Sequence, residues 1–146
     1  MKHIRKEIEV HAPLAEMWRA WTTAEGAKTF FGPEARVDLR IGGPYEILFD
    51  LEQPAGKRGG EGLTVLCYVP DELVAFQWNA PPDFPTLRDC PRTWVVVQLA
   101  PDGDRVKVTL RHYGFGEGAE WDRLYAYFQR AWGLVLAATA RLGNAG

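Results

Sequence analysis

A regular pattern of apolar residues occupies the C-terminal part of the chain. Across residues 121–142, apolar side chains recur every three or four positions, and this spacing puts them on one face of a single long helix. The face is unusually aromatic and comprises Trp121, Leu124, Tyr125, Phe128, Trp132, Val135, Leu136, Thr139 and Leu142. We therefore predict a long final helix that packs an aromatic face against the rest of the protein.

The segments before this helix alternate between apolar and polar residues. Such alternation is typical of strands in an antiparallel sheet that has one face in water. It is found in residues 3–10, 35–40, 45–50, 63–69, 74–79, 95–99 and 106–112. Turn signals separate several of these segments, such as Gly42-Gly43 and residues 101–104. We expect these strands to form one curved antiparallel sheet.

Two short helices are predicted between the first and second strands. Pro13 suits the first turn of a helix, and an apolar stripe follows it at Leu14, Met17, Trp18 and Trp21. Thr22 or Thr23 can cap a second short helix, which we expect to carry Ala27, Phe30 and Phe31. Gly32-Pro33 is expected to end this helix.

Two loops stand out by composition. Residues 52–60 contain four glycine and proline residues next to Lys57-Arg58, which indicates a flexible loop. Residues 79–92 contain four prolines, and a connection of this length is often a lid or binding loop. A plain long hairpin explains the second loop equally well, so both interpretations stay open.

Taken together, the elements predict one α+β domain over residues 1–146. We expect a curved antiparallel sheet, two short helices at one end, and the long C-terminal helix across the concave face. Large aromatic rings pack imperfectly against a curved sheet, so an apolar cavity between the helix and the sheet is a natural consequence.

The order of the elements and several motifs resemble a known family. The motifs are residues 8–13 followed by 17–22, residues 38–45, residues 62–78, residues 110–115, and the late Trp132. Nearly the whole chain resembles the helix-grip fold of the START-like superfamily, also called SRPBCC or birch-pollen-allergen-like. More narrowly, it resembles the family named for activator homologues of heat-shock-protein-90 ATPase. The resemblance implies a hydrophobic cavity and roles in ligand binding, cofactor-free cyclisation or hydrolysis, or chaperone regulation.

The chain departs from that family at two places. The family usually has a Trp before an aromatic residue at the end of the second helix, whereas this chain has Phe30-Phe31. The loop at residues 79–92 is also longer than the resemblance implies. Both departures lie where the family sets the size and entrance of its pocket, so a relative's ligand is not transferred to this chain.

Composition narrows the range of functions. The chain has 146 residues and a net charge of −2, which gives no general attraction to nucleic acid. No apolar stretch approaches the roughly 20 residues of a membrane span, and the N-terminus lacks the apolar core of a signal peptide. Cys67 and Cys90 have no metal or redox spacing, so we expect a cytoplasmic protein. The absence of serine excludes a serine nucleophile.

The predicted ligand pocket is defined by the inward-facing rings. It consists of Phe30, Phe31, Tyr45, Phe49, Phe76, Trp78, His112, Trp121, Tyr125, Phe128 and Trp132. His112 shares a strand face with Val108 and Leu110, so it is the candidate general base. The favoured alternative is a core histidine with satisfied hydrogen bonds. No cluster of residues has the spacing of metal ligands.

A glycine motif before the final helix has a less specific explanation. Residues 114–119 fit the G-x-G-x-x-G/A pattern of dinucleotide-binding proteins. That fold requires a second parallel strand after the helix, but the printed sequence contains none there. We therefore interpret the motif as a glycine-rich connection into the helix.

The leading hypothesis is the binding of a hydrophobic or amphipathic small molecule, without a cofactor and without catalysis. One alternative is a cofactor-independent cyclase, dehydratase or hydrolase that uses His112 or a loop carboxylate, for which Asp83, Asp89 and Glu117 are candidates. The other is a regulator of a heat-shock-protein-90-type chaperone. Pairing through an exposed strand edge makes a homodimer plausible.

Overall fold

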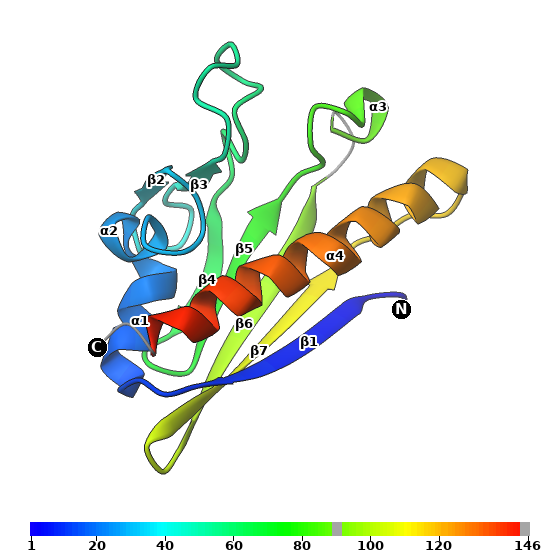
Figure 1. Cartoon of the computed structure of the whole chain (residues 1–146). Helices are drawn as coiled ribbons and strands as arrows, with labels where there is room; N and C mark the ends of the chain where they lie inside the picture. The colour runs from blue at the N-terminus through cyan, green and yellow to red at the C-terminus, as the bar shows by residue number, and fades with distance from the viewer. Residues whose placement is uncertain (89–91, 144–146) are drawn as a thin grey trace.

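The computed structural model describes residues 1–88 and 92–143 of the chain. Its main sheet has five antiparallel strands, with the spatial order β1-β7-β6-β5-β4. These strands are β1 (Ile4–Val10), β4 (Val65–Val69), β5 (Leu73–Trp78), β6 (Thr93–Asp102) and β7 (Arg105–Tyr113). A small second sheet pairs β2 (Glu34–Val37) with β3 (Tyr45–Leu48). The sheet curves beneath one long helix (Figure 1).

The inward face of the main sheet follows the predicted alternation. On β6, Val95, Val97 and Leu99 are buried, and they lie opposite His112, Leu110 and Val108 on β7. Apolar side chains therefore meet in cross-strand pairs on the concave face, which is the arrangement that stabilises a sheet with one dry side. Hydrogen bonds between Tyr45 and Leu63 and between Gly43 and Val65 connect the small sheet to the edge of the large one.

The first short helix agrees with the prediction, whereas the second is shorter than expected. Helix α1 (Leu14–Thr22) follows Pro13, and α2 (Ala24–Ala27) is capped by the Thr23 hydroxyl, which accepts the backbone N–H of Gly26 at 3.0 Å. The prediction that Phe30 and Phe31 lie on this helix is wrong. They fall in the turn after it. Pro33, a residue that cannot continue the helical hydrogen bonds, follows this turn, and β2 begins directly after it at Glu34.

The long helix α4 (Ala119–Leu142) confirms the main prediction from the sequence. It crosses the concave face of the sheet (Figure 1) and buries Leu124, Phe128, Trp132, Leu136 and Thr139. Its first turn is acidic and its last turn carries Arg141, which is the favourable arrangement for the helix dipole. The fold is thus α+β, with the sheet wrapped around a C-terminal helix.

The proline-rich loop contains a structure that the sequence did not predict. A one-turn helix, α3 (Pro85–Arg88), lies within it. The end of this loop at residues 89–91, which includes the candidate Asp89 and also Cys90, lies outside the described residues. Within the described part of the chain, the helices are too short or too polar to cross a membrane.

The packing of α4 gives a direct test of the fold. Leu136 is 3% exposed, and Leu134, on the same helix, is 67% exposed. We expect Leu136→Ala to lower the free energy of unfolding by about 2–5 kcal/mol because it opens a cavity beneath the helix. Leu134→Ala should change it by less than about 0.5 kcal/mol. Urea denaturation of both variants measures the difference, and equal losses would contradict this packing.

Candidate ligand cavity

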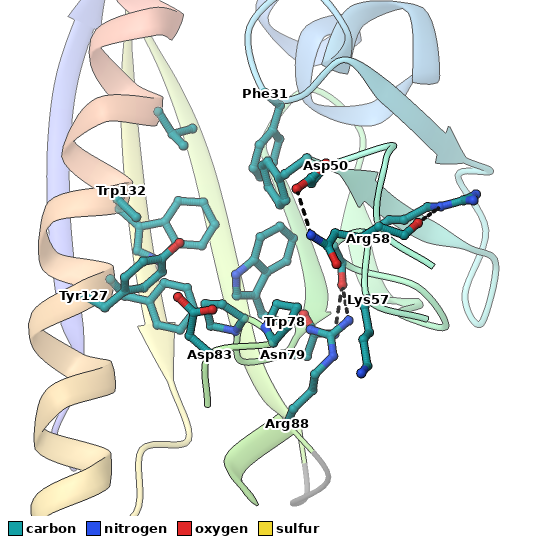
Figure 2. Close-up of a pocket in the computed structure, with 18 residues that line it drawn as sticks. Phe31, Asp50, Lys57, Arg58, Trp78, Asn79, Asp83, Arg88, Tyr127 and Trp132 are labelled. Atoms are coloured by element: carbon teal, nitrogen blue, oxygen red, sulfur yellow. Dashed lines mark hydrogen bonds between the residues drawn. The ribbon is translucent and has the colours of Figure 1, made fainter. Parts of the chain in front are cut away.

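A cavity of about 460 Å³ lies where α4 faces two loops at one end of the sheet. One loop joins β3 to β4, and the other follows β5 and includes α3. Figure 2 shows the cavity between the aromatic side chains of α4 on one side and Phe31, Trp78 and the loops on the other. The lining residues are Phe31, Phe49, Asp50, Gln53, Lys57, Arg58, Gly59, Trp78, Asn79, Pro81, Pro82, Asp83, Arg88, Tyr127, Phe128, Ala131, Trp132 and Val135.

The inner wall of the cavity is a set of aromatic rings. Trp78 stacks on Phe31 with ring centroids 5.5 Å apart, and it meets Trp132 of α4 at 5.1 Å. Phe49 contacts Trp78 edge-on at 6.3 Å, and Phe128 stacks on Trp132 at 6.1 Å. These rings come from four separate segments, so the cavity exists only in the folded protein.

The outer wall is polar. The Asp50 carboxylate accepts a hydrogen bond from the Gln53 amide at 3.4 Å, and the Asn79 amide donates to the carbonyl of Gly59 at 3.2 Å. Arg58 donates from Nε to the Gln53 carbonyl at 2.8 Å. The cavity therefore has an apolar inner wall and a hydrogen-bonding outer wall, a combination that orients an amphipathic molecule.

On α4, Tyr127 extends the apolar wall towards the opening. Its ring lies edge-on to Phe84 and Phe128, and Figure 2 shows its side chain beside Asp83. Partial burial raises the pKa of Tyr127, and the negative charge of Asp83 adds to the effect. The hydroxyl group consequently stays protonated and is able to donate a hydrogen bond to a molecule in the cavity.

A chain of buried hydrogen bonds fixes the two tryptophans of the inner wall. Trp132 donates from Nε1 to Nδ1 of His112 at 2.9 Å. Since Nδ1 is then the acceptor, Nε2 carries the proton and donates to the Thr93 hydroxyl at 2.7 Å. Thr93 in turn donates to the backbone carbonyl of Trp78 at 3.2 Å. This hydrogen-bond chain joins α4, β7, β6 and β5.

His112 therefore has the geometry of a structural residue. It is fully buried, it is absent from the cavity lining, and both its ring nitrogens have partners. Burial lowers its pKa to about 3, so the ring is neutral near pH 7. A general base must reach its substrate, and here the rings of Trp132 and Phe128 cover the imidazole.

The structure divides the predicted pocket residues into two groups. Five of them line the cavity: Phe31, Phe49, Trp78, Phe128 and Trp132. Six lie elsewhere: Phe30, Tyr45, Phe76, His112, Trp121 and Tyr125.

Residues of the second group are used for core packing or surface contacts. Tyr45 and Phe76 stack at 3.9 Å, and the buried Tyr45 hydroxyl donates to the Trp21 carbonyl at 2.7 Å. Burial raises the pKa of Tyr45, so its hydroxyl stays protonated. Phe30 packs on Trp21 at 4.8 Å. At the other end of α4, Tyr125 donates to the His3 carbonyl at 3.1 Å.

Several lining residues were missed by the analysis of the sequence. Most belong to the two loops, whose composition marked them as unusual without indicating which side chains face inward. Val135 belongs to the predicted face of α4 but was not among the predicted pocket residues, whereas Tyr127 and Ala131 flank that face, and a wider helical stripe would have included at least Ala131. Of the three loop carboxylates considered, Asp83 lines the cavity and Glu117 does not.

The described residues offer no alternative centre for a metal ion. Within residues 1–88 and 92–143, no group of three or more His, Cys, Asp or Glu side chains is arranged to hold one.

A curved antiparallel sheet closed around a C-terminal helix, with a cavity at one end, defines the helix-grip class of the START-like superfamily. The chain belongs to the family described as activator of Hsp90 ATPase homolog 1-like protein, whose model matches residues 11–142. No curated protein matches the chain at a significant level of sequence similarity.

Solved structures with this fold are distant in sequence. MLL2253 from Mesorhizobium loti is 18% identical, has a TM-score of 0.76, and covers 97% of this chain and 96% of its own. The Aha1 dimer from Colwellia psychrerythraea is 20% identical, with a TM-score of 0.74. The match covers 100% of this chain and 98% of the Aha1 chain. DynU16, from the dynemicin biosynthetic locus, is 18% identical, with a TM-score of 0.73. The match covers 100% of this chain and 48% of the DynU16 chain.

The hydrogen-bond chain predicts a large cost for replacing its central residue. His112→Leu leaves the indole N–H of Trp132 and the Thr93 hydroxyl without their buried partner, which should lower the free energy of unfolding by about 2–4 kcal/mol. His11→Leu is the control because its ring is exposed and lies 3.7 Å from the exposed Asp104 carboxylate. Urea denaturation at pH 7.5 compares them. Equal stability of the two variants would contradict the proposed chain.

The lowered pKa of His112 also predicts a pH dependence. Below the unfolded-state pKa of 6.5, the unfolded chain binds a proton that the folded protein excludes down to about pH 3. The stability should therefore fall by roughly 1.4 kcal/mol for each pH unit below 6.5. His112→Gln should remove this component of the slope. Urea denaturation between pH 7.5 and 5.5 tests it, and parallel profiles for the two proteins would refute it.

Proposed function

We propose that the protein binds an amphipathic small molecule in the cavity between α4 and the two loops, without catalysing a reaction on it. The observation that carries this proposal is the cavity itself, about 460 Å³ in volume, with aromatic rings on its inner wall and hydrogen-bonding groups on its outer wall. This volume falls in the range of roughly 300–1,000 Å³ that is typical of sites for small ligands.

The inner wall suits the apolar part of such a molecule. Trp78 and Trp132 are 4% and 2% exposed, so their rings are already held in place by the core. The apolar lining that a ligand can still cover includes the more exposed Phe49 and Tyr127, at 47% and 41%. Each Å² of this surface removed from water is worth about 25 cal/mol, before the cost of ordering. Because the wall is preformed, little of that gain is lost to rearrangement of the protein.

The polar part of the ligand would face the loops. Gln53 and Asn79 provide amide groups there, and Asp83 and Tyr127 provide a carboxylate and a hydroxyl. The lining also contains both signs of charge, with Asp50 and Asp83 against Lys57, Arg58 and Arg88, so this side of the cavity suits the polar end of a ligand. The biosynthetic locus from which DynU16 comes is consistent with a fold used for small molecules.

The geometry favours binding over acid–base catalysis. Such catalysis generally needs two titrating groups of matched pKa within reach of one substrate. The candidate His112 is buried behind Trp132 and engaged at both nitrogens. A cyclase, dehydratase or hydrolase mechanism through His112 would therefore have no general base in contact with its substrate.

Other expectations from the sequence remain proposals of lower specificity. Regulation of a heat-shock-protein-90-type chaperone rests on the family description. A homodimer rests on the exposed strand edge and on the dimeric state of the Colwellia psychrerythraea protein. A cytoplasmic location rests on composition alone.

A cavity-filling variant tests the binding proposal. Ala131 lines the cavity, whereas Ala137 lies on the exposed side of α4. We expect the wild type to bind the fluorescent probe 1-anilinonaphthalene-8-sulfonate, because the probe combines aromatic rings with one polar group. Ala131→Phe should weaken this binding at least tenfold, equivalent to about 1.4 kcal/mol, and Ala137→Phe should leave it unchanged.

The fluorescence titration is complemented by native mass spectrometry of the purified protein before and after denaturation. A small molecule released on unfolding would identify the natural ligand by its mass. Absence of probe binding to the wild type, or equal binding by Ala131→Phe, would refute the proposed site.

A further inference from the structure

We infer that Arg88 and Glu61 form an ionic strap that holds the outer wall of the cavity in place, and that this strap controls ligand retention. Only the second part of this inference, the control of ligand retention, rests on the proposed binding function. The strap joins the loop between β3 and β4 to the segment that follows β5, and these two loops carry the polar lining of the cavity.

Arg88 is the centre of this strap. Its Nη1 donates to the carbonyl of Ala80 at 2.5 Å, within its own loop. Its Nη2 crosses to the other loop and donates to the carbonyls of Gly56 at 2.7 Å and Gly59 at 2.8 Å. The side chain is only 13% exposed. The fixed fork of a guanidinium group suits such simultaneous contacts, which a lysine ammonium cannot reproduce in the same geometry.

Glu61 lies in the loop between β3 and β4 and binds the backbone of the same loop. Its carboxylate accepts backbone N–H groups from Arg58 at 2.9 Å and Gly59 at 2.8 Å, and it also accepts the N–H of Gly56. Its Oε1 lies 3.6 Å from Nη2 of Arg88. Gly56 and Gly59 thus present their N–H groups to the carboxylate and their carbonyl groups to the guanidinium.

The composition of this loop explains why a strap is needed. Residues 52–60 are rich in glycine, and Gly56 adopts a positive φ of 93°. Glycine loses more conformational freedom on ordering than other residues, so the sequence alone predicts a flexible segment. Charge-assisted hydrogen bonds are roughly twice as strong as neutral ones, and here they converge on two glycines of this loop, Gly56 and Gly59.

The strap also determines the shape of the cavity. Gln53, Lys57, Arg58 and Gly59 form its outer wall. Figure 2 shows the Arg88 guanidinium directed at this loop, where it donates to the carbonyl of Gly59. When the strap opens, the outer wall is free to move away from Trp78 while the aromatic inner wall stays in place.

The first test measures the strap without any ligand. Hydrogen–deuterium exchange of a peptide spanning residues 53–62 reports on the amides that Glu61 accepts. We expect Arg88→Gln and Glu61→Gln to accelerate exchange in this peptide at least tenfold, with exchange in β7 and α4 unchanged. Arg88→Lys should resemble Arg88→Gln because it lacks the fork. Unchanged exchange at residues 53–62 in Arg88→Gln would overturn the strap.

Arg105→Gln is the matched control. Arg105 pairs with Glu9 at 3.1 Å and lies at the β6–β7 turn, at the opposite end of the sheet from the two loops (Figure 1). The same change of charge should leave exchange at residues 53–62 as in the wild type. Faster exchange at residues 53–62 in Arg105→Gln would mean that the effect comes from general destabilisation of the fold, and it would overturn the inference.

The second test measures retention of bound 1-anilinonaphthalene-8-sulfonate by stopped-flow dilution. Glu61→Gln should release the probe at least fivefold faster than the wild type and Arg105→Gln. Glu61 is the residue changed because, unlike Arg88, it does not line the cavity and has no direct contact with the sulfonate to lose. Faster exchange at residues 53–62 with unchanged release would overturn the role in retention and leave the strap as a purely structural contact. If the wild type fails to bind the probe, the binding proposal and the retention role fail together, while the exchange experiment still decides whether the strap exists.

Discussion

The hydrogen-bond chain from Trp132 through His112 and Thr93 to Trp78 is the constraint on which the cavity depends. A neutral imidazole in an apolar core is tolerated only when both ring nitrogens are satisfied, since an unpaired buried polar group costs about 1–3 kcal/mol. Satisfying His112 requires one particular orientation of the Trp132 indole and one position of the Thr93 hydroxyl. The carbonyl of Trp78 completes the series. The polar groups of the core thus determine where α4 sits on the sheet, and the two almost fully buried tryptophans form a fixed base for the inner wall.

Aromatic packing is dense in one region beneath the small sheet and incomplete in another. Beneath the small sheet, Tyr45 and Phe76 stack closely and fill the interior. Near the loops, Phe31, Trp78 and Trp132 meet at centroid distances of 5.1–5.9 Å and at varied angles. These three rings pack mainly on one another and are at most 5% exposed, so the space between them and the loops is left unfilled. The cavity is therefore a consequence of the same aromatic residues that stabilise the core.

This division explains how far the sequence could predict the site. Periodicity is a local property, so the face of α4 and the inward registers of β6 and β7 follow from it directly. Whether an inward ring borders empty space or a neighbouring ring depends on contacts between distant segments. Phe49 and Phe76 alternate in the same way in the sequence, yet only Phe49 lines the cavity. The order in the loop at residues 52–60 also depends on a distant residue, Arg88, whose partners are backbone groups and a single carboxylate. No local pattern could reveal that contact.

The two walls of the cavity differ in what opening them would cost. Moving α4 away from the sheet would break the buried bonds of His112 and expose Phe128, Trp132 and Leu136 to water. Moving the loop at residues 52–60 would exchange hydrogen bonds at the protein surface for hydrogen bonds to water, at a net cost that is usually about 0.5–1.5 kcal/mol for each bond and more where a charge is involved. Local openings use the segments with the least buried apolar contact. For the proposed ligand, the route of lowest cost is therefore on the loop side, past the outer wall, while the helix and the sheet keep the inner wall fixed.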